Sequence, residues 1–201
     1  MGILGRSKMG EGNKWIKERN SFEEEFLALA DDASVLYESS VELHKAMQNF
    51  TKSVGEDEKK HPYGKASKAV KTYGANMKTS NGSFTKASEQ LDGLLAACHG
   101  LRDHINSTIM SKVISFKDID CKECDQLMSL LKKTNADFAK KKKANADQVQ
   151  IDALEASLKK VTEDAKNMLA KFNKNGFELM NQLASDMKNG FDAYCDAGGS
   201  A

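Results

Sequence analysis

The sequence has little proline, few aromatic side chains and no long apolar run. Among its 201 residues there is one proline, Pro62, and 7% are aromatic, whereas alanine, leucine, lysine, glutamate and methionine are plentiful. This composition favours helix throughout and predicts an all-α fold. No apolar run is longer than that of residues 94–98, which is far short of the roughly 20 residues that a membrane span needs. Any contact with a membrane is therefore expected to be peripheral.

Cysteine is scarce too, and its spacing does not predict a metal site. No secretory leader is recognisable ahead of the four cysteines, so we expect a reduced, cytoplasmic protein. Cys121 and Cys124 form a Cys-x-x-Cys pair inside a helical pattern, but no second pair lies at the spacing of a zinc site. Both are interpreted as structural helix residues, and we expect no metal and no other cofactor.

The sequence also lacks the residue arrangements of common catalytic sites. His99 and His104 are five residues apart and do not share a helix face, while His44 and His61 stand alone. There is no glycine-rich phosphate loop and no carboxylate pair in a pocket-forming context. We therefore predict that the chain is not an enzyme and has no catalytic residue.

Apolar residues recur every seven positions in the first part of the chain. Six consecutive heptads predict a helix of about 40 residues over 15–54, packed in a coiled-coil manner. Residues 1–14 contain four glycines and are predicted to form a flexible or short amphipathic leader. The heptad stripe consists of Trp15, Phe22, Leu29, Leu36, Leu43 and Phe50.

Two further long helices are expected. Charged residues, glycine and Pro62 at 55–64 predict a connection, after which a second helix is expected from near Lys65 to about Ala144. This helix is weakened at 79–83 and has a candidate kink at 111–115. A turn at 145–147 precedes the third helix, and residues 197–201 are predicted to be a disordered tail.

Three helices of this length predict an extended antiparallel bundle rather than a compact globule. So thin a bundle buries little apolar surface, and the stripe of the first helix offers a face on which a second copy can dock. We therefore predict a homodimer. The residues expected at its interface are Trp15, Phe22, Leu29, Leu36 and Leu43.

Positive charge is concentrated in the middle of the chain. The net charge is only +1, but residues 1–60, 61–147 and 148–201 carry −3, +6 and −2. Within residues 130–145 there are six lysines and a single acid, Asp137. Such a basic helix face is expected to meet an anionic partner.

The same region contains a set of helix residues in a recognisable order: Phe116, Asp120, Lys122, Leu127, Lys132, Lys133 and the run Ala136, Asp137, Phe138. This set resembles the second-helix signature of BAR (Bin/amphiphysin/Rvs) domains, a family of membrane-curvature modules. The resemblance extends over a domain at 15–196 and implies a crescent-shaped antiparallel homodimer that binds anionic phospholipid through its concave face and tips. Its implied role is membrane remodelling or vesicle trafficking, as in endocytosis.

Nine lysines are predicted to bind lipid. On the concave side we expect Lys122, Lys132, Lys133 and Lys140. At the tip we expect Lys141, Lys142 and Lys143. On the third helix, seven residues apart, we expect Lys159 and Lys166.

Two alternatives remain open at this point. A basic stripe can bind nucleic acid, but the aromatic residues here occupy heptad positions instead of alternating with the lysines, so we expect no nucleic acid. A coiled-coil adaptor that binds a small GTPase or a cytoskeletal protein, without lipid, has the same sequence pattern. Co-sedimentation with liposomes separates the lipid-binding prediction from both.

Overall fold

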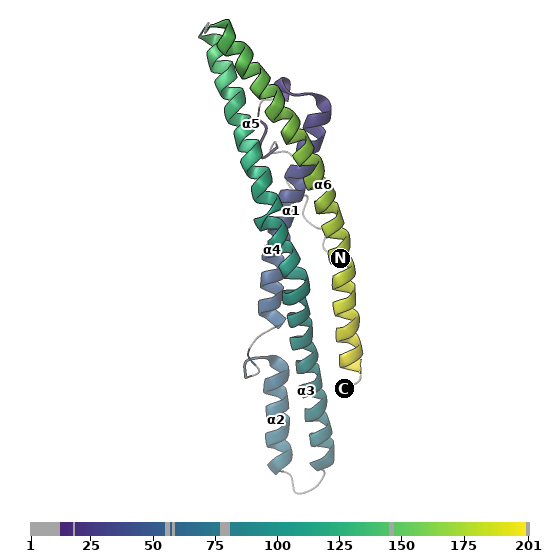
Figure 1. Cartoon of the computed structure of the whole chain (residues 1–201). Helices are drawn as coiled ribbons and strands as arrows, with labels where there is room; N and C mark the ends of the chain where they lie inside the picture. The colour runs from purple at the N-terminus through teal and green to yellow at the C-terminus, as the bar shows by residue number, and fades with distance from the viewer. Residues whose placement is uncertain are drawn as a thin grey trace. The chain divides into compact units, whose positions relative to one another are not determined.

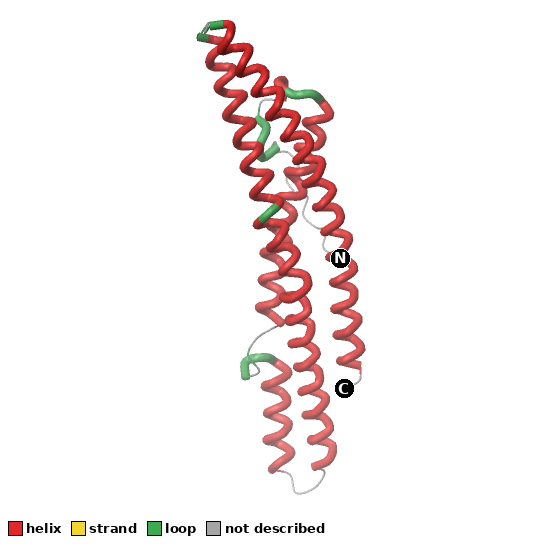
Figure 2. The backbone as a smooth tube through the Cα atoms, viewed as in Figure 1, coloured by secondary structure: helices red, strands yellow, loops and turns green. Residues whose placement is uncertain are grey.

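The structure is a computed structural model that describes residues 13–17, 19–54, 57, 59–76, 81–144 and 147–199. Every regular element among these residues is helical, so the predicted all-α class is confirmed (Figure 2). The α-helices, labelled in Figure 1, are α1 (Glu24–Val54), α2 (Pro62–Asn76), α3 (Asn81–His104), α4 (Ser111–Asp118), α5 (Asp120–Lys143) and α6 (Gln148–Gly199). A 3₁₀-helix, Arg19–Ser21, precedes α1, and a π-helix, Ile105–Met110, joins α3 to α4.

The chain divides into two compact units. Unit 1 spans Met1–Val41 and Ser115–Glu178, and unit 2 spans Glu42–Ile114 and Leu179–Ala201. Three helices, α1, α4 and α6, contribute residues to both units. The single domain predicted at 15–196 thus takes in residues of both units. Helix α6 continues to Gly199, so residues 197–199 of the predicted tail are helical.

Unit 1 is built on aromatic packing between α4 and α6. The rings of Phe116 and Phe172 lie 5.0 Å apart, and Phe172 is only 1% exposed. A Cβ atom added at Gly176 would lie 3.0 Å from Cδ1 of Leu36, so glycine lets α6 approach α1 closely. Further along, the Asn175 amide donates a hydrogen bond of 2.7 Å to the Asp120 carboxylate, and the Lys141 ammonium lies 3.5 Å from the Gln150 side chain, so α5 and α6 run antiparallel.

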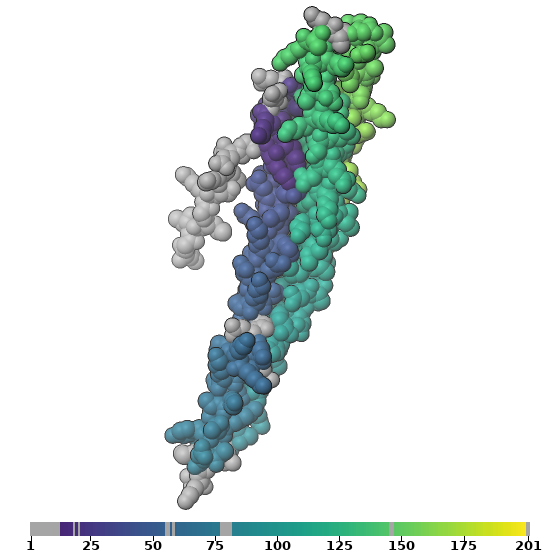
Figure 3. All heavy atoms as spheres, turned by 90° about the vertical axis from the view of Figure 1, so that its left-hand side faces the viewer, coloured from purple at the N-terminus to yellow at the C-terminus, as the bar shows by residue number. Residues whose placement is uncertain are grey.

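In unit 2, helices α2 and α3 lie side by side and antiparallel (Figures 1 and 3). The Lys71 ammonium is 2.7 Å from the Asp92 carboxylate across this hairpin. An interruption does occur between Val54 and Pro62, as predicted, but the chain also reverses between Asn76 and Asn81. The predicted continuous helix from Lys65 is therefore two antiparallel helices. A polar run rich in glycine and serine can reverse a chain as well as weaken a helix, and local sequence does not decide between the two.

The path from α3 to α5 is irregular at two places, neither of them within 111–115. The Ser107 hydroxyl donates to the Asp103 carbonyl at 2.7 Å, and the Ser111 hydroxyl donates to the Ser107 carbonyl at 2.7 Å. Both hydroxyls therefore bond carbonyls one turn earlier, within or beside the π-helix at Ile105–Met110. The second irregularity is Ile119, which separates α4 from α5.

Candidate functional site

The segment before α1 is not part of a helix that begins at Trp15. The Asn13 side chain accepts hydrogen bonds from the backbone N–H groups of Trp15 (2.9 Å) and Ile16 (3.1 Å), forming a tight turn. The Ser34 hydroxyl accepts the N–H of Lys14 at 3.1 Å, and Ile16 is buried. The predicted start of the first helix at Trp15 was therefore wrong. Side-chain oxygens accept the N–H groups here, in place of the backbone carbonyls that accept them in a helix.

Asp125 of α5 ties this segment to the rest of unit 1. The Trp15 indole N–H donates to its carboxylate at 2.7 Å, and the Lys14 ammonium lies 3.0 Å from the same oxygen, Oδ1. The Lys14 ammonium also lies 3.0 Å from the centroid of the Tyr37 ring, a cation–π contact. In Figure 3 the first described residues (purple) lie against α5 (green).

The pKa values of this cluster follow from its contacts. Burial by itself raises the pKa of Asp125, but hydrogen bonds from Trp15 and Lys14 outweigh it and hold that pKa below its usual value. Burial lowers the pKa of Lys14, but its interactions with Tyr37 and Asp125 outweigh burial and raise it. Both groups are therefore charged near neutral pH, and each stabilises the other.

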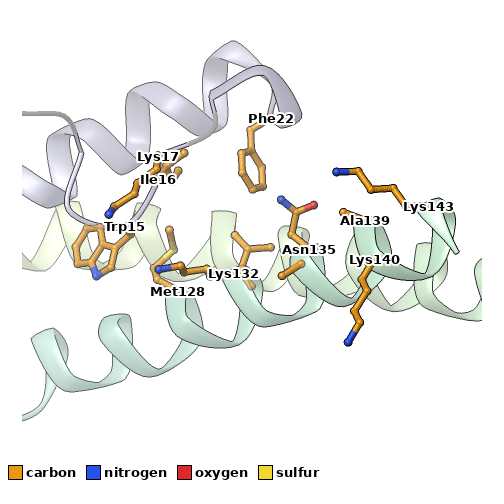
Figure 4. A pocket seen from close by; sticks show the side chains of 12 residues that line it. Trp15, Ile16, Lys17, Phe22, Met128, Lys132, Asn135, Ala139, Lys140 and Lys143 are labelled. Carbon is orange, nitrogen blue, oxygen red and sulfur yellow. The ribbon is translucent and has the colours of Figure 1, made fainter.

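A groove of about 560 Å³ lies between the segment before α1 and α5 (Figure 4). The segment before α1 contributes three apolar side chains to the lining, Trp15, Ile16 and Phe22, together with Lys17. Half of the eight lining residues from α5 are small or apolar: Met128, Leu131, Ala136 and Ala139. The volume of the groove falls in the range of about 300–1,000 Å³ that is usual for sites that bind small molecules.

Four lysines contribute to the lining of this groove. They are Lys17, Lys132, Lys140 and Lys143, and no acid is among the described residues that line it. In Figure 4 the Lys143 amine extends to the side of α5 on which Phe22 lies, whereas the Lys140 amine extends to the opposite side. Asn135 points toward Phe22 across the groove and is the one uncharged polar side chain in the described lining. The groove therefore combines an apolar interior with a positive rim.

All nine lysines predicted to bind lipid lie in unit 1, but on different faces. Lys132 and Lys143 face the groove, while Lys122, Lys133 and Lys140 lie together roughly 80° further round α5 at 100° per residue. Lys141 hydrogen-bonds Gln150 of α6 at 3.5 Å. The Lys142 ammonium lies 5.7 Å from the centroid of the Phe138 ring, and Lys159 is exposed on α6.

Two of the nine lysines have acidic partners. The Lys122 ammonium is 3.4 Å from Asp118 one turn earlier, and the Lys166 ammonium is 2.6 Å from Glu25 of α1. The other seven form no ion pair with any residue in the described part of the chain. They are Lys132, Lys133, Lys140, Lys141, Lys142, Lys143 and Lys159.

The residues predicted at a dimer interface have contacts within their own chain. Trp15 and Phe22 precede α1, and the Phe22 ring stacks on Phe26 with centroids 5.0 Å apart. Leu36 is 7% exposed and packs next to Gly176. The two remaining members, which are half-buried on α1, are Leu29 and Leu43.

The Cys-x-x-Cys pair faces the core of unit 1. The Cys121 thiol lies 3.7 Å from the Ser40 hydroxyl, and Cys124 is fully buried. Burial, followed by the nearby Asp125 charge, raises the pKa of Cys124 to about 12, and burial also raises that of Cys121. Both thiols are thus held protonated, which opposes the thiolate state that metal binding and nucleophilic attack require.

Sequence reasoning identified Lys132, Lys140 and Lys143 but not the groove that they surround. It missed Lys17 and the role of Asp125, because no local pattern links Trp15 to a residue 110 positions later. The heptad position of Trp15 indicated that its ring would pack against another part of the chain, but it did not indicate which part.

Comparison with models of known protein families and with curated proteins found no match. Among the described residues, no helix has both the length and the apolar character needed to cross a bilayer. The chain is therefore characterised by its all-helical fold and by the groove and lysines of unit 1.

Proposed function

We propose that the chain is a peripheral membrane protein that binds anionic phospholipid surfaces in the cytoplasm through α5. The binding element, here called the basic surface, consists of Lys132, Lys133, Lys140, Lys141, Lys142 and Lys143. All six are exposed, and none is ion-paired with another described residue. This unpaired charge is the observation that carries the proposal, because like charges one turn apart destabilise a helix unless an opposite charge lies near them.

The energetics of such a surface are sufficient for reversible binding. Each lysine near an anionic leaflet gains about 1 kcal/mol, so several acting together hold a protein at the membrane. Asp137 is the one acid between Lys132 and Lys143 and offsets little of this attraction. Salt screens these interactions over a Debye length of about 8 Å at physiological ionic strength, so binding weakens as salt rises.

Curvature dependence is the part of the proposal that rests on the resemblance to BAR domains. There, two antiparallel three-helix bundles pair into a crescent, and membrane remodelling or vesicle trafficking follows from its shape. In this reading the chain is a homodimer and the basic surface lies at the tips and concave side. Its role is binding, not catalysis.

Co-sedimentation with phosphatidylserine vesicles tests the proposal. The charge-reversed variant combines Lys133→Glu, Lys140→Glu and Lys142→Glu, and we expect it to stay in the supernatant at physiological salt while the wild type sediments. The matched control carries the same change of charge in unit 2, as Lys45→Glu, Lys68→Glu and Lys86→Glu, and should sediment. Undiminished sedimentation of the first variant, or equal loss in both, refutes the basic surface.

A coiled-coil adaptor for a small GTPase or a cytoskeletal protein is the second candidate. It is favoured by exposed apolar side chains in unit 1, since single exposed residues are ordinary but several can provide a docking face. If the wild type does not sediment with vesicles, this candidate takes precedence. The residues concerned are Val35, Ile119, Leu130 and Phe177, which are 48–56% exposed.

A further inference from the structure

The groove in unit 1 is held open from both sides. Trp15 is fixed on one wall by its hydrogen bond to Asp125, and Phe22 is fixed by its stacking on Phe26. The opposite wall is the regular helix α5. Because its walls are positioned by contacts outside the groove itself, a ligand does not have to order them, which removes part of the entropic cost of binding.

The chemistry of the groove selects a particular kind of ligand. Its interior is apolar, so an apolar group is favoured there. Lys132 and Lys143 are eleven residues apart and stand about 16 Å from each other along α5, at 1.5 Å per residue. Together with Lys17 on the facing segment, they place positive charge along the rim, and no acid is among the described lining residues. This charge favours an anionic ligand.

The lining also distinguishes a lipid from an extended peptide. A peptide bound in an extended conformation needs partners for its backbone N–H and C=O groups, and unpaired groups are costly once buried. Asn135 is the one uncharged polar side chain of the described lining, and the Trp15 N–H is already bonded to Asp125. A hydrocarbon chain needs no such partners.

We propose that this groove binds one molecule of a monoacyl lipid with an anionic head group. The acyl chain lies between Phe22 and the small side chains Ala136 and Ala139, and the head group pairs with lysines of the rim. The inference shares Lys132, Lys140 and Lys143 with the basic surface and so rests in part on the proposed function. It adds a specific site for a single lipid molecule, which the attraction of lysines to a bilayer does not require.

Trp15 is the only tryptophan of the chain and lines the groove, so its fluorescence reports on occupancy. The probe is lysophosphatidic acid, titrated into the full chain below its critical micelle concentration. We expect a saturable change in Trp15 emission with one molecule bound. Lysophosphatidylcholine, which has a chain but no net charge, should bind at least about tenfold more weakly, since a charge-assisted contact is lost. Glycerol 3-phosphate, which has no chain, should not bind measurably.

Variants locate the site. Ala136→Phe fills the groove from an exposed helix position and should abolish the change in emission, whereas Ala156→Phe, at an exposed position of α6 outside the groove, should not. Combining Lys132→Gln with Lys143→Gln should weaken the binding of lysophosphatidic acid by about tenfold or more and leave the binding of lysophosphatidylcholine unchanged. Lys133→Gln, one residue along but on another face, is the control and should bind normally.

The results separate this inference from the proposed function. Ala136→Phe should still sediment with phosphatidylserine vesicles. Lys133→Glu combined with Lys142→Glu, neither of which lines the groove, should weaken sedimentation while Trp15 still responds to lysophosphatidic acid. No saturable response in the wild type, equal affinity for the two lysolipids, or an unaffected Ala136→Phe would overturn the inference. Tighter binding of an acidic amphipathic peptide at the same site would overturn it too, because the groove would then be a peptide site.

Discussion

The Trp15 indole N–H donates a hydrogen bond of 2.7 Å to the Asp125 carboxylate, across 110 residues of sequence. This bond, with the Lys14 ion pair beside it, fastens the segment before α1 to α5 and so forms one side of the groove. Its strength therefore affects both the stability of unit 1 and the shape of the candidate site.

Replacing Asp125 with alanine should release the segment. The change removes a charged acceptor from both Trp15 and Lys14, and we expect the free energy of unfolding to fall by about 1–2 kcal/mol, because the carboxylate is partly exposed and screened. Released Trp15 should emit at longer wavelength in the folded protein. Chemical denaturation and the native emission spectrum measure the two effects, and an unshifted spectrum would show that the bond does not hold the segment.

The same carboxylate should make stability depend on pH. Because the pKa of Asp125 in the folded chain is below its unfolded value of about 3.9, its contribution is present above that pH and is lost as the pH falls through the folded pKa. Asp125→Asn cannot titrate, so the difference in unfolding free energy between wild type and this variant should shrink in acid. A difference that stays constant from neutral pH to about pH 2 contradicts the assignment.

Gly190 in α6 should not tolerate alanine. An added Cβ would lie 2.6 Å from Cδ2 of His104, so the ring must move and its 2.9 Å hydrogen bond to the Asp186 carbonyl is strained or lost. We expect a net loss of about 1–2 kcal/mol, since this clash exceeds the gain in helix propensity. Gly100 of α3 is the matched control: nothing lies within 4 Å of its added Cβ, and Gly100→Ala should stabilise by up to about 1 kcal/mol.

Two phenylalanines five residues apart on α6 should differ in their effect on stability. Phe172 is 1% exposed and packs on Phe116, whereas Phe177 is 56% exposed. Phe172→Ala should cost about 3–5 kcal/mol through lost burial and a cavity, and Phe177→Ala less than about 1 kcal/mol. Thermal or urea unfolding followed by circular dichroism compares them; similar costs would mean that unit 1 does not pack as described.

The four cysteines should react unequally with a thiol reagent. Cys195 is exposed, and the other three are buried. Ellman's reagent should label Cys195 rapidly in the folded chain, while Cys121 and Cys124, whose pKa values are raised, should react only on unfolding. The Cys195→Ser variant is the control and should show no fast phase. A fast phase that survives in it means that at least one of the other three thiols is not buried.

Local sequence was a good guide to helix content and to the lysines of α5. Apolar residues spaced three and four positions apart correctly placed Cys124 and Leu131 in the core and Lys133 and Lys140 on the surface, because the same helix face recurs at this spacing. It misplaced the start of α1, since Trp15 fits a heptad but is held in a turn by Asn13. It also treated residues 65–144 as one helix, because the antiparallel pairing of α2 with α3 depends on contacts between them.

The sequence by itself determined that the chain is helical and that its positive charge gathers near Lys140, since propensity and side-chain spacing are local properties. Tertiary structure alone decided that Trp15 would meet Asp125 and that Leu36 would lie against Gly176. It also decided that a groove would form between the segment before α1 and α5. These outcomes depend on which distant residues touch, and no periodicity within a segment carries that information.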